Sequence, residues 1–218
     1  GGKNMYEELF LRKLVDEKFH YDIKLSYNKI TNIDFGRKFV NQINNLSNNE
    51  LNVIVYNFVD MLSHARTDMK VIKELAEDDY AYRSLTLSWF EHSPLREILR
   101  KISVQGAKLI ITTDHGTINV EKPIKIIGDR NVNSNLRYKQ GKNLNFKANE
   151  VFEISDPHSY FLPKQNISSK FIFNTEKNYF VYQNNYNNFV NFYKNTYQHG
   201  GISMEEMLVP IIKLNSKK

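Results

Sequence analysis

The stretch "LIITTDHGT" (residues 109–117) decides the fold class and raises the question of function. It starts with apolar and β-branched residues, which are typical of a buried strand. It ends with Asp114 and His115 in adjacent positions, followed by Gly116. Two strongly polar side chains at the end of a strand indicate either a polar turn or the edge of an active site. Other parts of the sequence help to distinguish the two.

A second apolar run, "NVIVYNFV" (52–59), predicts another buried strand, which ends at Asp60. Helical patterns at 71–77 and 88–103 lie between the two strands, and Pro94 predicts a break in the second helix. Continuously apolar strands separated by helices are typical of a parallel sheet that is covered on both faces. We therefore expect an α/β fold with a mixed, mostly parallel sheet and helices on both faces.

The remaining segments are shorter and more polar. Helical spacing recurs at 5–19, 35–46 and 186–196, whereas 20–33 is polar and extended and predicts no definite element. Ser203 and Glu206 have capping-box spacing for a short helix before a final strand at 208–214. Further extended segments predict strand pairs at the sheet edge: 117–128, 151–155, 160–163, 170–174 and 178–183.

The composition is that of an ordinary globular protein. The 218 residues are 41% hydrophobic and 25% charged, which is enough for one large domain or for a core with an appendage. We find no apolar run of about 18 residues and no signal-peptide pattern, and the chain has no cysteine, so we expect a cytoplasmic protein without disulfides or thiolate metal sites. The net charge of +6 favours anionic partners such as nucleic acid, although Lys/Asn-rich proteins are often basic without one.

Three of the six histidines lie in contexts that indicate metal binding. His64 follows Asp60 by four residues, His115 follows Asp114 directly, and His199 precedes two glycines. Ligands of α/β sheets bind at the carboxyl ends of the strands, and imidazole and carboxylate groups suit Zn²⁺. Asp60, His64 and His199 would fill one site, and Asp114 and His115 part of another. The alternative, that these are ordinary turn residues, stays open, and we interpret His20, His92 and His158 as structural or surface residues.

Three motifs resemble those of a known family. In order they are "NFVDMLSH" (57–64), "TTDHGT" (112–117) and "YQHGGISMEEMLVP" (197–210), which resemble the metal motifs of the alkaline phosphatase superfamily. The strongest resemblance is to the PglZ domain that closes PorX-type response regulators of the type IX secretion system. The tract "GDRNVNSNLRYKQGKNL" (128–144) is similar to the same subgroup. The resemblance runs from about residue 52 to the end of the chain.

The resemblance implies a site with two zinc ions. Asp60, His64 and His199 would hold the first ion, and Asp114 and His115 would belong to the second. The second ion also needs a further Asp, and a Thr or Ser between the metals acts as nucleophile. Within 1–51 we predict no buried strand ahead of Asp16, Asp22, Thr31 or Asp34, so we expect the nucleophile upstream of this chain. On this basis 1–51 is a mainly helical insertion or cap, 52–218 is the C-terminal part of the domain, and the fragment alone is inactive.

The resemblance also implies a function, namely hydrolysis of phosphodiesters in short oligonucleotides by the output domain of a two-component regulator. We expect Arg137 and Arg130, with Lys139, to contact substrate phosphate, and Tyr138 to stack on a base. A sigma factor or secretion-system protein is an expected partner, the full-length protein could dimerise, and no membrane contact is expected. Two other functions stay open: a zinc-stabilised interaction module without catalysis, and a basic nucleic-acid-binding domain.

Overall fold

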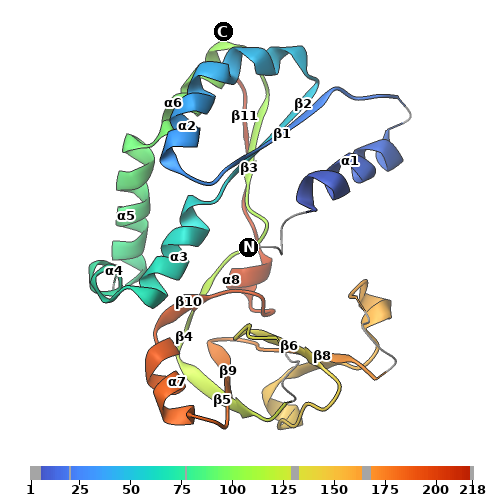
Figure 1. Cartoon of the computed structure of the whole chain (residues 1–218), viewed down its shortest axis with the longest axis vertical. Coiled ribbons are helices and arrows are strands. Elements are labelled where there is room, and N and C mark those ends of the chain that lie inside the picture. Colours follow the sequence, from blue (N-terminus) through green and yellow to red (C-terminus); the bar gives the residue numbers. More distant parts are fainter. Residues whose placement is uncertain (1–5, 20, 77, 129–132, 164–167, 217–218) are drawn as a thin grey trace. The chain divides into compact units, whose positions relative to one another are not determined.

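A computed structural model describes residues 6–19, 21–76, 78–128, 133–163 and 168–216 (Figure 1). The first half of the chain forms α1 (Glu7–Lys18), β1 (Leu25–Ile30), α2 (Ile33–Gln42), the 3-10 helix η1 (Ile43–Asn48), β2 (Leu51–Tyr56), α3 (Phe58–Asp68), α4 (Lys70–Leu75), α5 (Asp79–His92) and α6 (Pro94–Val104). The second half forms β3 (Leu109–Thr112), β4 (Ile118–Val120), β5 (Lys122–Ile126), β6 (Tyr138–Gly141), η2 (Ala148–Glu150), β7 (Phe152–Ile154), η3 (Pro157–Tyr160), β8 (Lys170–Phe173), β9 (Asn178–Tyr182), α7 (Tyr186–Tyr193), β10 (Thr196–Gln198), α8 (Met204–Met207) and β11 (Ile211–Leu214). No helix among these described residues is long and apolar enough to cross a membrane.

The chain divides into two compact units, which we call the first and the second unit. The first unit comprises residues 1–62, 75–109 and 213–218, and the second unit comprises 63–74 and 110–212. The chain passes from one unit to the other within helix α3, so this helix contributes residues to both.

The first unit is built on a parallel strand pair and two amphipathic helices. Strands β1 and β2 pair in parallel from Leu25 and Leu51 to Ile30 and Tyr56. Helix α2 begins after Asn32, whose side chain accepts a hydrogen bond from the backbone N–H of Phe35. Helix α6 begins at Pro94, which needs no N–H donor in the first turn. One face of each helix joins β1 in a common core: Ile30, Phe39, Ile43, Leu46, Ile98 and Ile102.

The second unit is built around strand β9, which is buried on both faces. Strand β9 pairs in parallel with β5, and β4 pairs with β10 in antiparallel orientation. Because side chains alternate along a strand, Phe180 packs into one cluster with Ile124, Ile126 and Ile172, while Tyr179 and Val181 pack into another. An antiparallel three-stranded sheet, in the order β6-β8-β7, completes this unit (Figure 1).

The structure confirms the α/β class and most of the expected elements. Helices lie near 5–19, 35–46 and 186–196, the chain breaks at Pro94, and both hydrogen bonds of the Ser203–Glu206 capping box are present. Strands occur in four of the five expected later segments. The segment 160–163 is the exception, because 157–160 form a 3-10 turn that begins at Pro157 and Phe161 then has a φ of 56°.

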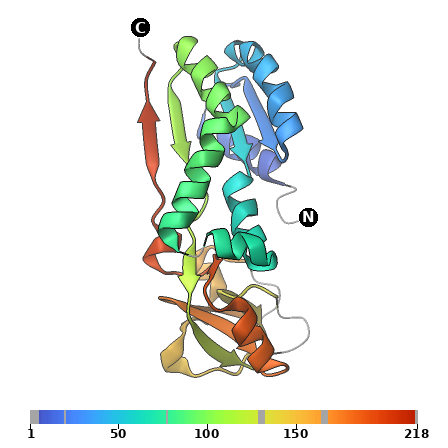
Figure 2. The ribbon, with the colours of Figure 1, turned by 90° about the vertical axis from the view of Figure 1, so that its left-hand side faces the viewer.

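Three expectations about the strands were wrong. The polar segment 20–33 contains strand β1, and this strand is the partner of β2. Strand β2 stops at Tyr56, so Phe58 and Val59 belong to helix α3 and Asp60 lies in its first turn instead of at a strand end. Strand β3 pairs with β11, as Figure 2 shows, and within the described residues it shares no sheet with β2. The expected boundary between 51 and 52 stays a prediction.

Candidate metal centre

Helix α3 carries the first of the expected ligands. Asp60 and His64 are four residues apart on this helix, so their side chains lie on the same face, one turn from each other. Asp60 lies in the first turn, where the positive end of the helix dipole favours a carboxylate. The sequence pattern Asp-x-x-x-His therefore places both side chains through helical geometry, whereas the sequence predicts Asp60 at the end of a strand.

Arg66 fixes the second half of α3 against strand β10. This side chain is 1% exposed, its guanidinium donates to the backbone oxygen of Asn195 at 3.0 Å, and it lies 4.5 Å from the ring centre of Tyr197. The contact combines a hydrogen bond with a cation–π interaction. Because β10 leads directly to His199, Arg66 ties the helix of His64 to the segment of His199. The centres of these two imidazole rings lie 6.0 Å apart.

His115 and His199 are brought together by the antiparallel pair β4–β10. In its register Gln198 lies opposite Ile118, so the loop before β4 and the loop after β10 leave the sheet at the same end. The two imidazole rings stack with centroids 4.0 Å apart and an interplanar angle of 13°. Nδ1 of His115 is 3.0 Å from the carbonyl oxygen of Gly116. When Nδ1 donates to this oxygen, Nε2 has the lone pair that a metal requires.

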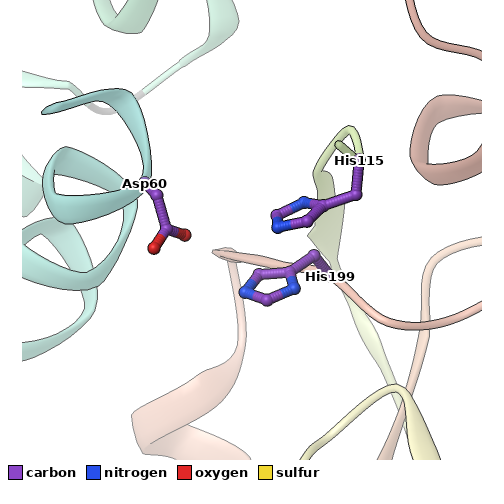
Figure 3. A group of neighbouring side chains, drawn as sticks. All are labelled: Asp60, His115 and His199. Atoms are coloured by element: carbon purple, nitrogen blue, oxygen red, sulfur yellow. The ribbon is translucent and has the colours of Figure 1, made fainter. Parts of the chain in front are cut away.

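Figure 3 shows the two stacked imidazoles with Asp60 of helix α3. Each of these three residues offers one atom that could bind a metal ion, and His115 and His199 both belong to the second unit. Two imidazole nitrogens and one carboxylate oxygen form a donor set that suits Zn²⁺, which binds such atoms at about 2.0–2.2 Å. The chemistry of the residues present therefore fits a divalent metal.

Asp114 and His115 lie close together, with Oδ1 of Asp114 3.8 Å from Nε2 of His115. The carboxylate of Asp114 is 79% exposed and turns onto its own loop, where it accepts from the backbone N–H of His115 at 3.1 Å and from the hydroxyl of Thr113 at 3.4 Å. His115 also stacks on His199, which was assigned to the other zinc ion. The expected assignment of the five residues to two zinc ions stays a prediction.

The expected substrate-binding arginines lie in different situations. Arg137 is fully buried, and its guanidinium is bonded to the carboxylate of Glu206 at 2.9 and 2.6 Å. The pair ties the start of strand β6 to helix α8, and the expected contact of Arg137 with substrate stays a prediction. Glu206 was noticed in the sequence only as a helix cap, and no signal in the polar tract around Arg137 identified the pair. Arg130 lies outside the described residues.

Lys139 and Tyr138 follow Arg137 on strand β6. The ammonium of Lys139 is buried and donates to the backbone oxygen of Asn133 at 2.8 Å, and burial lowers its pKa to about 8. Tyr138 is half-buried and stacks against Phe171 and Phe173, with ring centroids 6.4 and 6.1 Å apart. Tyr138 is therefore partly accessible to a ligand, whereas the charged group of Lys139 is not accessible from solvent.

Thr31 occupies a position that the sequence did not predict. It directly follows Ile30, the buried last residue of β1, and it precedes Asn32, the N-cap of α2. Thr31 therefore follows a strand that the sequence did not predict, although only the last residue of this strand is buried. The expectation that the nucleophile lies upstream of this chain stays a prediction.

Comparison with known proteins gives one family. A family model described as "BREX system PglZ alkaline phosphatase-like domain" matches residues 1–214. No match was found among curated proteins. The matched region includes the whole second unit, most of the first unit and all five residues that the sequence assigned as metal ligands.

Proposed function

Because the chain belongs to the PglZ family of alkaline phosphatase-like domains, we propose that it carries the zinc-binding histidines of a phosphodiesterase. Membership indicates a phosphoesterase-type function. The observation that carries the zinc proposal is the stacking of His115 on His199 at 4.0 Å, together with the imidazole of His64, whose ring centre lies 6.0 Å from that of His199. The preference for a diester and the identity of the ion go beyond membership and are part of the proposal.

The residues would divide the work as follows. His64, His115 and His199 would hold the ion, and Asp60, one helical turn before His64, and Asp114, next to His115, would be further ligands. When bound, zinc lowers the pKa of a coordinated water to roughly 7 and polarises a phosphoryl oxygen. The carbonyl of Gly116 orients the imidazole of His115, and Arg66 holds helix α3 against the segment of His199.

Tyr138 supports an oligonucleotide as the substrate. Its ring lies against Gly200, where an added Cβ would be 3.0 Å from the ring carbon Cδ1, so it neighbours the residue that follows His199. Aromatic rings that stack on bases bind single-stranded nucleic acid without strong sequence preference. The net charge of +6 favours the same polyanionic substrate.

The resemblance to PorX-type regulators supports a place in signalling. On that basis we propose a cytoplasmic output domain of a two-component response regulator that controls type IX secretion. A sigma factor or a secretion-system protein would be its partner, and the full-length protein would act as a dimer. The full domain would hold two zinc ions.

A zinc-stabilised interaction module is the second candidate function. It is favoured by exposed apolar side chains on and after helix α8, which lie near the C-terminal end of the chain: Met204, Met207, Leu208 and Ile211. Such side chains in one segment are typical of contact with another protein surface.

Zinc content of the purified chain tests the metal site. We expect about one zinc ion per wild-type chain by elemental analysis, and none in a His64→Ala/His199→Ala variant. His92→Ala is the matched control, because His92 is an exposed residue at the end of helix α5 and should leave the zinc content unchanged. Equal zinc content in all three proteins, or none in the wild type, would contradict the proposal.

Hydrolysis separates the two candidate functions. The phosphodiesterase predicts zinc-dependent cleavage of a short oligonucleotide by protein that contains the nucleophile, and loss of cleavage in the His64→Ala variant. Thr31→Ala in the same assay shows whether this threonine takes part. The interaction module instead predicts that zinc raises the thermal stability while no cleavage occurs at any zinc concentration.

A further inference from the structure

Arg137 and Glu206 form a buried ion pair within the second unit. Nε of Arg137 lies 2.9 Å from Oε1 of Glu206, and Nη2 lies 2.6 Å from Oε2. The two side chains are 0% and 2% exposed. A bidentate contact of this kind fixes the orientation of both planar groups. The pair is therefore a rigid element that links two segments 69 residues apart in the sequence.

Glu206 is bonded to both loops that carry the stacked histidines. Its carboxylate accepts from the backbone N–H of Gly201 at 2.8 Å, two residues after His199. Its backbone oxygen accepts from the N–H of Gly116 at 2.9 Å, one residue after His115. One residue of helix α8 therefore holds the segment of His115 through its main chain and the segment of His199 through its side chain.

Arg137 extends the same network on the other side of the carboxylate. Its guanidinium also donates to the carbonyl oxygens of Asn174, at 3.3 Å, and Asn178. The side-chain oxygen of Asn135 accepts from the backbone N–H of Arg137 at 2.7 Å, and its Nδ2 donates to the backbone oxygen of His199 at 3.3 Å. The arginine is thus connected to the histidine loop both through Glu206 and through Asn135.

The two glycines beside the histidines show how closely the network approaches the main chain. A Cβ added at Gly201 would lie 2.7 Å from Nη2 of Arg137. A Cβ added at Gly116 would lie 1.8 Å from the backbone oxygen of Glu205. Only glycine permits such close packing. The loop of His199 therefore packs directly against Arg137, and the loop of His115 packs directly against helix α8.

We propose that Arg137 and Glu206 are positioning residues that set the distance between His115 and His199, and hence the affinity of the metal site. This inference rests on the proposed metal function. A buried ion pair is often no more stabilising than well-packed apolar residues of similar size, so the contacts with both loops indicate a geometric role. Burial acts to raise the pKa of Glu206, but hydrogen bonds from Arg137 and Ser203 outweigh it and leave this pKa below its usual value. The carboxylate is therefore ionised at neutral pH, as the pair requires.

A double substitution, Arg137→Met/Glu206→Met, tests the proposal. A single substitution would leave one uncompensated charge in the interior, whereas the double variant removes both charges and approximately keeps the side-chain volume. We expect nuclear Overhauser contacts between the two imidazole rings in the metal-free wild type and their loss in a folded double variant. We also expect zinc to bind the variant about 10–100 times more weakly than the wild type.

Two control variants separate positioning from general stability. Lys177→Met/Glu121→Met removes an exposed ion pair of 2.6 Å in the same unit and should keep both the ring contacts and the affinity. Ile172→Ala destabilises the core of the second unit, where Ile172 is 0% exposed, but should also keep the ring contacts. Glu206→Gln retains an acceptor for the N–H of Gly201. Its ring contacts and its zinc affinity should therefore lie between those of the wild type and those of the double variant.

The outcomes separate this inference from the proposed function. Ring contacts that persist in the folded double variant would overturn the positioning role. If the double variant does not fold, Glu206→Gln decides, because unchanged ring contacts there would overturn the role and weakened contacts would support it. A wild type that shows the ring contacts but binds no zinc would overturn the metal function, while the effect of the variants on the ring contacts would still decide the positioning role.

Discussion

The buried charge of Lys139 has a large effect on the pKa of this side chain. Folding removes its ammonium from water and provides the carbonyl of Asn133 at 2.8 Å and the ring of Tyr182, whose centre is 4.5 Å away. These contacts compensate only part of the lost hydration, so burial lowers the pKa from 10.5 to about 8. A charge that is useful for binding phosphate would be expected at the surface, and Lys139 is 1% exposed.

The lowered pKa of Lys139 predicts a pH-dependent stability. Between about pH 8 and 10.5 the unfolded chain binds a proton at this lysine that the folded chain has released, so the free energy of unfolding rises with pH in this window. Below pH 8 the buried charge costs about 3 kcal/mol. In Lys139→Met this contribution is absent. We expect the difference in unfolding free energy between variant and wild type, measured with urea, to shift in favour of the wild type by up to about 3 kcal/mol from pH 8 to 10.5. A difference that does not change with pH would contradict the assignment.

At the scale of elements, local signals predicted helices better than strands. Helix α6 was recognisable because Pro94 marks its start and Ile98 and Ile102 recur on one face. Strand β1 was not, because Tyr27 and Lys29 are polar at their tips and bind Glu7 of helix α1, a contact that no local pattern shows. The end of β2 was also misplaced, since Phe58 and Val59 continue the apolar run into helix α3.

The start of helix α2 allows a direct test of one element. The side-chain oxygen of Asn32 accepts from the backbone N–H of Phe35 at 2.8 Å and so satisfies a donor that the helix cannot. Asn32→Ala should lower the free energy of unfolding by about 1 kcal/mol. Asn32→Asp keeps the acceptor and places a negative charge at the helix N-terminus, so it should retain or slightly raise stability. The free energy of unfolding of both variants is measured with urea. If it falls by the same amount in both, the hydrogen bond of the cap is not the cause of the lost stability.

At the scale of the whole molecule, the sequence motifs identified the histidines but not the contacts between them. The three histidine contexts were visible as motifs, but the pairing of His115 with His199 depends on the register of β4 with β10, strands that lie far apart in the chain. Adjacency of Asp114 and His115 did not reveal that the carboxylate turns back onto its own loop. The burial of Arg137 likewise depends on Glu206, which no local pattern connects to it.

The division into two units predicts two unfolding transitions. The core of the first unit includes Ile98 and that of the second includes Ile172, each 0% exposed and each in its own cluster. Trp89, the chain's single tryptophan, stacks on Phe58 at 3.6 Å in the first unit, so its fluorescence reports on that unit alone. Replacing a buried isoleucine by alanine costs about 2–5 kcal/mol.

We therefore expect Ile98→Ala to lower the urea midpoint of the tryptophan transition, and Ile172→Ala to leave it unchanged. Circular dichroism, which averages over the chain, should show the Ile172→Ala effect as a separate, earlier transition. If instead both variants shift the fluorescence midpoint by the same amount, the two cores unfold together. Zinc bound by the histidines of the second unit should raise the midpoint of the transition that Ile172→Ala lowers, because a ligand stabilises the folded state that holds it.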